Sequence, residues 1–370
     1  MKSKFFPALA VLVGTTIGAG FLGIPYVVSK SGFLPGLAYL IFVALFMLFM
    51  KLYLGEVILR TNGNHQLTGY AGMYLGKWAK FLMFFSMIFG IYSALIAYLI
   101  AEGQSLSYLI LGTSNYSLYF SLAFWLLMSC LTYIGMVALK KYEKIGMVLI
   151  LAVVLIVFLF FFRGIKIENL SNINSENIFL PFGVILFSFL AFSAMPEVRR
   201  VLSMQEKLMK KVIFIGVMIP FIVYFVFMLV MVGNFGLQIP EIATLALPRF
   251  FSILAILTMF TAFFAQSIAI RDMFRFDYHL GRFNGWLLAS FLPLVLFLLI
   301  YFFKLASFVT LLGIAGIVAA GLNGILILLM NKKSKKEGNR KPEYSVSLSW
   351  KTIIILSLIF ILAVAAEFLL

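Results

Sequence analysis

Charged residues are scarce in this sequence: only 11% of its 370 residues are Asp, Glu, Lys or Arg, while 64% are hydrophobic. A soluble globule of this length needs a larger polar share to cover its surface. The single cysteine, Cys130, excludes an intramolecular disulfide and a zinc site built from cysteines. The two histidines, His65 and His279, lie far apart and share no metal-ligand spacing. These shortages exclude a soluble domain and a disulfide-stabilised scaffold.

Motifs of catalysis and nucleotide binding are also missing. The sequence has no glycine-rich loop followed by Lys and Ser or Thr, and no nucleophile elbow. We therefore expect no enzymatic activity.

Long apolar runs follow one another along the whole chain, each with the ~20 residues that carry a helix across a membrane. We expect about eleven such helices in a single all-α membrane domain, 1–370; ten or twelve are the alternatives, because only Lys304 separates the ninth from the tenth. The first begins near Lys4 and has no cleavage site, so we expect a retained helix rather than a signal peptide. The expected spans are residues 6–29, 33–59, 80–110, 117–138, 144–162, 181–202, 212–234, 246–270, 284–303, 305–330 and 350–370.

The formal net charge of +16 is distributed unevenly along the chain. Most of the 29 Lys and Arg residues fall in alternate connecting segments, for example Lys2, Lys140, Lys141, Arg199 and Arg200. Basic loops stay in the cytoplasm, so we expect a multi-pass protein of the cell membrane with its N-terminus cytoplasmic and its C-terminus extracytoplasmic. Attraction to anionic membrane lipids accounts for the basicity, so nucleic acid is not an expected partner. No obligatory protein partner is evident.

The first expected span has small and polar residues at its centre, reading GTTIGAGFLGIPY over residues 14–26. Glycine accepts the backbone angles of an unwound segment, and proline removes a helical hydrogen bond. The cluster predicts a helix broken at the membrane midplane, whose freed N–H and C=O groups face a ligand. Close helix packing through small residues is the alternative.

The sixth expected span is interrupted in the same way, reading FSFLAFSAMPE over residues 187–197. An ordinary proline kink is the alternative here. Spans one and six are, however, matching members of two five-helix halves, 1–162 and 181–330, which the extra helix 350–370 follows. Interrupted helices at matching places are typical of the binding site of a transporter.

The strings IGAGFLGIPY, SGFLPG and SFLAFSAMPEV resemble those of the amino acid/auxin permease family and the related aromatic amino acid permeases, in the amino acid–polyamine–cation superfamily. Helix order and length agree over nearly the whole chain. The resemblance implies the LeuT-like fold, an inverted repeat of five plus five helices with helices one and six broken, and an eleventh helix. It also implies an ion-coupled symporter that imports amino acids by alternating access.

We expect the amino acid to bind between the two breaks. Its carboxylate would accept from N–H groups at the start of the outer half of the first span, because a helix N-terminus carries partial positive charge. Freed carbonyls would accept from its ammonium group. Neither break contains a charged residue within the binding segment, which predicts a neutral substrate. The predicted substrate-binding residues are Thr15, Thr16, Ile17, Gly18, Ala19, Gly20, Tyr92, Phe189, Phe192 and Ser193.

The resemblance also implies where a coupling ion would bind. Sodium-using relatives hold Na⁺ between carbonyls of helix one and hydroxyls of helix eight, and the matching positions are Gly14, Ile17, Thr258 and Thr261. Ala262 stands where a second hydroxyl is common, and helix five lacks the lysine of some proton-coupled relatives. Na⁺ and H⁺ therefore both stay open, and hydroxyls bonded back to their own helix are the alternative for the threonines. No other cofactor or metal is expected.

Two carboxylates at membrane depth are further candidates, because ionisable groups there are energetically expensive. Glu102 is a candidate proton site. Glu197 is a candidate inner gate that pairs with Arg200 or Arg271. The alternative for both is a charge that reaches a helix end.

Two other functions fit the same helix layout. A non-transporting receptor, similar to germinant-receptor subunits, would bind an amino acid without moving it. An ion channel would conduct without saturation, but the sequence contains no repeat that is similar to a selectivity filter.

Overall fold

The structure is a computed structural model that describes residues 3–135 and 143–369. The basic residues Lys2, Lys140 and Lys141 and the last residues of the expected spans 117–138 and 350–370 lie outside the described residues. Every regular element in the described part is a helix, apart from one isolated bridge between Gly32 and Ile173. The expectation of an all-α protein is confirmed.

Helices of very different length make up the described chain. The α-helices are α1 (Phe5–Thr16), α2 (Gly20–Ser31), α3 (Phe33–Leu59), α4 (Leu67–Leu75), α5 (Lys77–Leu111), α6 (Ser117–Ile134), α7 (Glu143–Phe161), α8 (Glu168–Ser171), α9 (Leu180–Ser188), α10 (Met195–Val201), α11 (Met209–Phe235), α12 (Ser252–Phe276), α13 (Arg282–Phe303), α14 (Phe308–Glu337) and α15 (Trp350–Leu369). Short 3-10 helices join them: η1 (Phe162–Gly164), η2 (Ser175–Asn177), η3 (Phe192–Ala194), η4 (Glu206–Leu208), η5 (Gly236–Gln238), η6 (Ala243–Ala246) and η7 (Arg249–Phe251).

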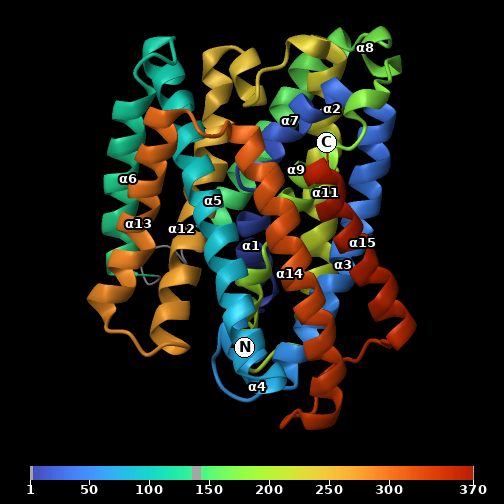
Figure 1. The fold of residues 1–370 in the computed structure, drawn as a ribbon. Coiled ribbons are helices and arrows are strands. Elements are labelled where there is room, and N and C mark those ends of the chain that lie inside the picture. Colours follow the sequence, from blue (N-terminus) through green and yellow to red (C-terminus); the bar gives the residue numbers. More distant parts are fainter. Residues whose placement is uncertain (1–2, 136–142, 370) are drawn as a thin grey trace.

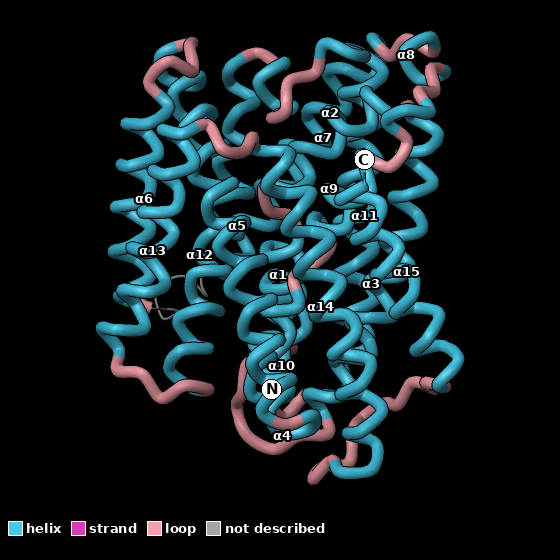
Figure 2. Tube along the Cα trace, viewed as in Figure 1, coloured by secondary structure: helices cyan, strands magenta, loops and turns pink. Residues whose placement is uncertain are grey.

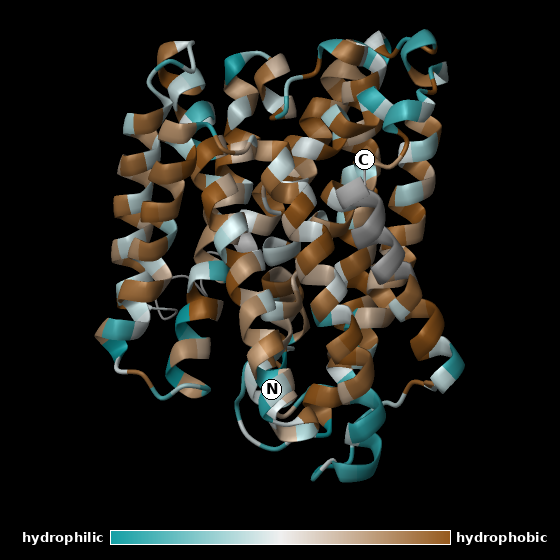
Figure 3. Cartoon of the chain, in the orientation of Figure 1, coloured by the Kyte–Doolittle hydropathy of each residue, from teal (hydrophilic) through white to brown (hydrophobic). Residues whose placement is uncertain are grey.

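The long helices match the expected membrane spans. Nine described helices are long and apolar enough to cross a membrane, and the pair α1 and α2, bent by 46° at the break, makes ten. Helix α15 stands where the last span, 350–370, was expected. Figure 3 shows hydrophobic residues along the middle of the bundle and hydrophilic residues at both ends, as a lipid environment requires.

The connections between helices test the expected boundaries of the spans. The division of the ninth from the tenth span is confirmed, because α13 ends at Phe303 and Lys304 takes a left-handed conformation with φ 50°. The basic stretch after residue 331, expected to be a loop, is helical as far as Glu337 because α14 continues through it. The short helix α4, at the N-terminal end of α5, was not expected.

The broken helices lie at the centre of the bundle. In the most apolar stretch of the segment Leu180–Val201, which holds α9 and α10, 89% of residues are buried, against 78% for α14 and 72% for α5. The corresponding fraction is 22% for α7 and for α13, so these helices face the surroundings. Figure 1 shows α1, α9 and α14 between α6 and α13 on one side and α3 and α15 on the other. Figure 2 shows the interruptions as loop segments in the middle of the bundle.

A buried carboxylate fixes one end of the bundle, where α1 begins and α4 lies; we call it the basic end. The carboxylate of Glu56, in α3, is fully buried. It accepts hydrogen bonds from Arg60 (2.9 Å), Ser345 (2.7 Å), the Val346 N–H (3.0 Å) and Asn331 (3.2 Å). These bonds tie α3 to α14 and to the segment that leads to α15.

We expect Glu56→Gln to destabilise the protein by about 3 kcal/mol, because the amide has one acceptor oxygen and turns its NH₂ group toward donors that are then left unpaired. The midpoint of thermal unfolding in detergent measures the effect. Glu337→Gln is the matched control, since its carboxylate is half exposed and 3.6 Å from Lys333. Such a surface pair contributes less than about 1 kcal/mol. Equal shifts in the two variants would contradict the prediction.

Candidate functional site

The first break separates α1 from α2. Helix α1 ends at Thr16 because Ile17 leaves the helical region with φ −82° and ψ 78°. The Gly18 N–H turns back to the Thr16 carbonyl at 3.0 Å. Helix α2 then begins at Gly20, so the first N–H groups of α2 have no partner within the helix. The break therefore presents a half-helix C-terminus and a half-helix N-terminus a few residues apart.

The second break separates α9 from α10. Helix α9 ends at Ser188, and Ala191 adopts a left-handed conformation with φ 41° and ψ 27°. That conformation costs a residue with a Cβ roughly 1–2 kcal/mol, and such strain concentrates at functional sites. Helix α10 restarts at Met195 with Pro196 in its first turn, where proline is favoured because its missing N–H is not needed.

The two breaks are in direct contact. A Cβ added to Gly20 would lie 2.6 Å from Ser188 Oγ and 2.9 Å from its Cα, so only glycine fits this approach. The hydroxyl of Tyr224, in α11, lies 2.8 Å from the Thr16 carbonyl and 2.8 Å from the Ser188 carbonyl. The Tyr224 hydroxyl thus lies between the last carbonyls of α1 and α9 and has one proton to donate to them, so α11 is held against both breaks.

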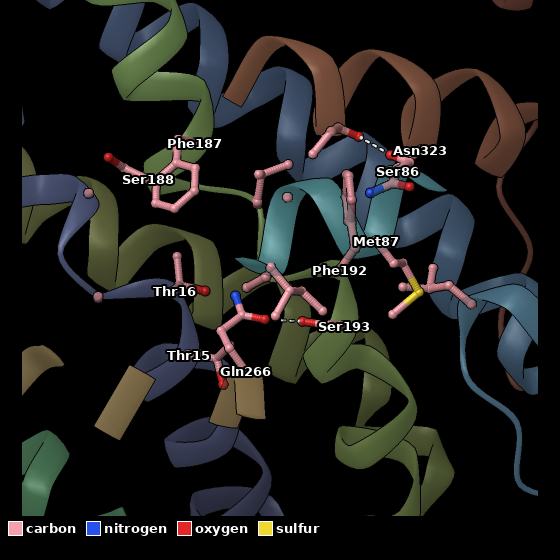
Figure 4. A pocket seen from close by; sticks show the side chains of 18 of the residues that line it. Thr15, Thr16, Ser86, Met87, Phe187, Ser188, Phe192, Ser193, Gln266 and Asn323 are labelled. Carbon is pink, nitrogen blue, oxygen red and sulfur yellow. Dashed lines mark hydrogen bonds between the residues drawn. The ribbon is translucent and has the colours of Figure 1, made fainter. Parts of the chain in front are cut away.

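A cavity opens between the two breaks (Figure 4). The volume of this cavity is ≈ 40 Å³, which is room for about three waters. Its walls come from both breaks, from α5, α12 and α14, and from the start of α4. The lining residues are Thr15, Thr16, Gly18, Gly20, Leu67, Ser86, Met87, Gly90, Ile91, Tyr98, Phe187, Ser188, Leu190, Ala191, Phe192, Ser193, Gln266, Ala319 and Asn323. None of them is charged.

Polar groups stand on two sides of this cavity. Figure 4 shows Gln266 and Ser193 meeting near Thr15, and the Ser193 hydroxyl donates to Gln266 Oε1 at 3.0 Å. Ser86 and Asn323 lie on the opposite side. The Asn323 Oδ1 atom is buried and has no hydrogen-bond partner among the described residues. An unpaired buried acceptor is costly, so Asn323 is suited to receive a donor from a ligand.

Six of the ten predicted substrate-binding residues line the cavity: Thr15, Thr16, Gly18, Gly20, Phe192 and Ser193. The hydroxyls of Thr15 and Thr16 donate back to the carbonyls of Val11 (2.8 Å) and Leu12 (2.7 Å). Each hydroxyl oxygen keeps lone pairs, so it is an acceptor for a ligand.

The other four predicted residues lie outside the lining. Ile17, Ala19 and Phe189 are fully buried in or beside the breaks, and the Phe189 ring packs edge-on against Tyr224, with centroids 5.0 Å apart. Tyr92 points away, since its hydroxyl donates to the Leu288 carbonyl of α13 at 2.9 Å. Tyr98 takes the place expected for Tyr92: a Cβ on Gly18 would lie 2.7 Å from its hydroxyl.

The predicted cation residues have their own hydrogen bonds. The Thr258 hydroxyl donates to the Ala255 carbonyl at 2.9 Å, and the Thr261 hydroxyl to the Thr258 carbonyl at 3.0 Å. Gly14, in α1, has open space where a Cβ would lie. This is the back-bonded arrangement that the sequence left as the alternative, although it does not remove the lone pairs of the hydroxyls.

The two predicted carboxylates differ in environment. Glu102 is buried in α5, and its Oε2 atom has no hydrogen-bond partner among the described residues. Glu197 Oε2 lies 2.6 Å from Arg200 Nε. Arg200 also lies 3.2 Å from Asp272, which pairs in turn with Arg271 at 3.1 Å. These four charges form a chain at the basic end, below the cavity.

Sequence reasoning missed Tyr224, Gln266, Asn323 and Ser86, and it placed Lys51 inside a membrane span without giving it a role. Gln266 and Asn323 carried a usable signal, because an amide within an apolar span needs a partner. Tyr224 carried none, since its part depends on where α11 crosses the two breaks.

The sequence of this chain is similar to those of known transporters. Residues 1–245 and 241–367 match the tryptophan/tyrosine permease family. Glutamine transporter 2 of Aliivibrio fischeri is 23% identical over 243 residues, which are 63% of this chain. The matched part is 62% of that relative, less than two thirds of its length.

Solved structures share the fold. The manganese transporter of Eremococcus coleocola, crystallised with an aromatic bis-isothiourea substituted compound, superposes with a TM-score of 0.70 at 14% identity and covers 98% of this chain and 86% of its own. Mhp1, a nucleobase-cation-symport-1 family transporter in a closed conformation with bromovinylhydantoin bound, has a TM-score of 0.62 at 12% identity over 87% of this chain and 77% of its own. The expected LeuT-like arrangement is confirmed.

The resemblance seen in the sequence is confirmed at the level of amino acid permeases, and the assignment to the amino acid/auxin family stays a prediction. Because the family match runs from residue 1 to residue 367, the chain belongs to the tryptophan/tyrosine permease family.

Proposed function

We propose that the protein is a secondary active transporter that imports neutral amino acids across the cell membrane by alternating access, coupled to Na⁺ or H⁺. The contact between the two broken helices carries this proposal. It joins a half-helix N-terminus at Gly20, a half-helix C-terminus at Ser188 and a polar cavity. An amino acid zwitterion needs partial charges of both signs within a few ångströms, and helix ends supply them without an ionised side chain.

The chemistry of the lining supports a neutral substrate. A carboxylate on the substrate is matched by the free N–H groups at Gly20 and Phe21, and its ammonium group by carbonyls of the second break and by the Thr15 hydroxyl. No charged side chain lines the cavity to neutralise a third charge. The side chain of the substrate then meets Ser86 and Asn323 on one side and the Phe187 and Phe192 rings on another.

Transport requires this cavity to enlarge, because an amino acid does not fit in a space for about three waters. A second cavity lies toward the basic end, lined by Glu197 and Arg200 and sharing Thr15 and Ser193 with the first. The hydrogen bond between Ser193 and Gln266 separates the two cavities. Opening it, together with the ion pair between Glu197 and Arg200, connects the site to the basic end, so Glu197 fits the role of inner gate.

The orientation follows from the basic residues. Contacts of Lys4 with Ser203, Arg199 with Gly63 and Lys80 with Asp277 gather basic residues from several segments at one end. Basic loops are retained in the cytoplasm, which supports an N-terminus inside and a C-terminus outside. We also propose the division into halves 1–162 and 181–330, a place in the amino acid–polyamine–cation superfamily, and lipid and amino acid as the partners.

We expect saturable uptake of at least one of L-tryptophan, L-tyrosine and L-glutamine into proteoliposomes under an inward Na⁺ or H⁺ gradient. Gly20→Ala should lower the uptake rate by about tenfold or more, which corresponds to ~1.4 kcal/mol, because its Cβ would force Ser188 and the second break away. Gly281→Ala is the matched control, since nothing lies within 4 Å of its Cβ position. An uptake rate that is unchanged in Gly20→Ala would show that transport does not depend on the contact between the two breaks.

Competition between amino acids tests the charge of the substrate. We expect unlabelled neutral amino acids to inhibit uptake, and lysine, arginine, aspartate and glutamate to inhibit at least about tenfold more weakly, because burial of an unpaired charge is costly. The measured quantity is the concentration that halves the initial rate. Strong inhibition by a charged amino acid would contradict a neutral substrate.

The receptor alternative gives a different outcome in the same assay. A sensor would bind an amino acid, measured by equilibrium binding in detergent, with no flux under either gradient. Membership of a permease family argues against the receptor. An ion channel would give flux that does not saturate as the amino acid concentration rises.

A further inference from the structure

Lys51 is a buried base that the transport site described above does not use. Its side chain is fully buried in α3. Eight residues separate it from the end of α3 at Leu59, or ~12 Å at the helical rise. The ammonium group therefore does not reach water at that end, and its side chain extends toward the first break instead.

The surroundings of Lys51 do not neutralise a positive charge. The side chain makes one hydrogen bond, from Nζ to the Thr16 hydroxyl at 3.5 Å. No described carboxylate lies within ion-pair distance of Lys51. An ammonium group has three donors and a large hydration energy, so a charged lysine here is expensive and a neutral amine is not.

Thr16 links this amine to the substrate site. It is the last residue of α1, and it lines the central cavity. The C-terminus of a helix carries partial negative charge, which favours a cation placed beside it. The amine is thus held where burial favours the neutral form and the helix end favours the charged form. A nearby change of charge is sufficient to decide between them.

We propose that Lys51 is the proton site of this transporter: its amine takes up a proton when substrate binds at the first break and releases it when substrate leaves. The inference rests on the proposed transport of amino acids. The carboxylate of the substrate, bound at the start of α2, brings a negative charge to the far side of the break from Lys51. Opposite charge favours the ammonium form, so substrate and proton bind together and leave together.

Other titratable groups near α3 are already engaged or lie elsewhere. Glu56 on α3 binds Arg60, Glu197 on α10 binds Arg200, and Arg199 on α10 donates to the Gly63 carbonyl. Of the tyrosines on α3, Tyr53 donates to the Ser347 carbonyl at 3.3 Å and Tyr39 packs against Phe182. Helices α1 and α9 have no titratable side chain. The hydroxyl of Tyr224, on α11, is shared by the two breaks, and that of Tyr344 donates to the Leu52 carbonyl at 2.8 Å. The remaining groups on helices packed against α3 lie toward helix ends: Tyr26 and Lys30 of α2, Glu168 of α8, Lys210 and Lys211 of α11, and those from Lys332 onward on α14.

Proteoliposomes that contain a pH-sensitive dye test the proposal with L-tryptophan, L-tyrosine and L-glutamine as probes. We expect the wild type to admit protons with the amino acid and to accumulate it under an inward proton gradient. Lys51→Met should keep exchange of labelled for unlabelled amino acid but lose proton entry and at least about tenfold of the accumulation. Lys77→Met is the matched control, because Lys77 is exposed at the start of α5.

The pH dependence gives a second readout. As external pH rises, the wild type should need more amino acid for half-maximal exchange, because the neutral amine no longer attracts the carboxylate. Lys51→Met should show no such change. Lys51→Arg, whose side chain stays charged, should exchange without accumulation and without this pH dependence. If gel filtration shows that Lys51→Met does not fold, Lys51→Gln and Lys51→Arg carry the same comparison.

The outcomes separate this inference from the proposed function. Proton-driven accumulation by Lys51→Met within twofold of the wild type would overturn the role of Lys51 and leave transport intact. Wild-type uptake driven by Na⁺ with no proton entry would do the same. No flux of any amino acid in the wild type would overturn the proposed function itself.

Discussion

Every backbone N–H and C=O group in the apolar middle of this bundle needs a partner within the protein, because lipid offers none. The two broken helices violate this rule unless they lie against each other and against polar side chains. Gly20 lets them meet, and the Tyr224 hydroxyl lies within 2.8 Å of a freed carbonyl of each. One phenol proton cannot satisfy two carbonyls at once. The Asn323 Oδ1 atom, which has no hydrogen-bond partner among the described residues, lies at the cavity between the breaks.

The arrangement of charge follows from the same constraint. Carboxylates that pair with arginines lie toward the basic end, where Glu56 contacts Arg60 and Glu197 contacts Arg200. The cavity itself is polar but uncharged. A neutral lining binds a zwitterion through helix ends and releases it again, whereas a fixed charge in a low-dielectric site would bind one end of the substrate too tightly to let it leave. Lys51 stands behind this lining and contacts Thr16, which is part of it.

Local sequence signals predicted the breaks, because four glycines and a proline in the first span, and Ser, Ala and Pro in the sixth, are properties of short segments. Six residues of the breaks that line the cavity were predicted in this way, whereas Ile17, Ala19 and Phe189 of the same segments lie outside the lining. Contributions from other helices do not, since they depend on how each helix is rotated. Tyr92 and Tyr98 differ by six residues, and only the packing of α5 turns Tyr98 toward Gly18. For the same reason Tyr224 required the structure, whereas Gln266 and Asn323 stood out as amides in apolar spans and only their direction toward the cavity required it.

Electrostatics explains why a proton and an amino acid are coupled through one short segment. Residues 17–19 join the negative end of α1 to the positive end of α2. In the proposed mechanism the substrate carboxylate lies at the start of α2 and the Lys51 ammonium beside the end of α1, and each strengthens the other because opposite charges attract. Either charge alone leaves its opposite helix end unmatched. This proposal does not require a sodium ion between Gly14 and Thr258, because Lys51 would supply a cation that loads and unloads by protonation.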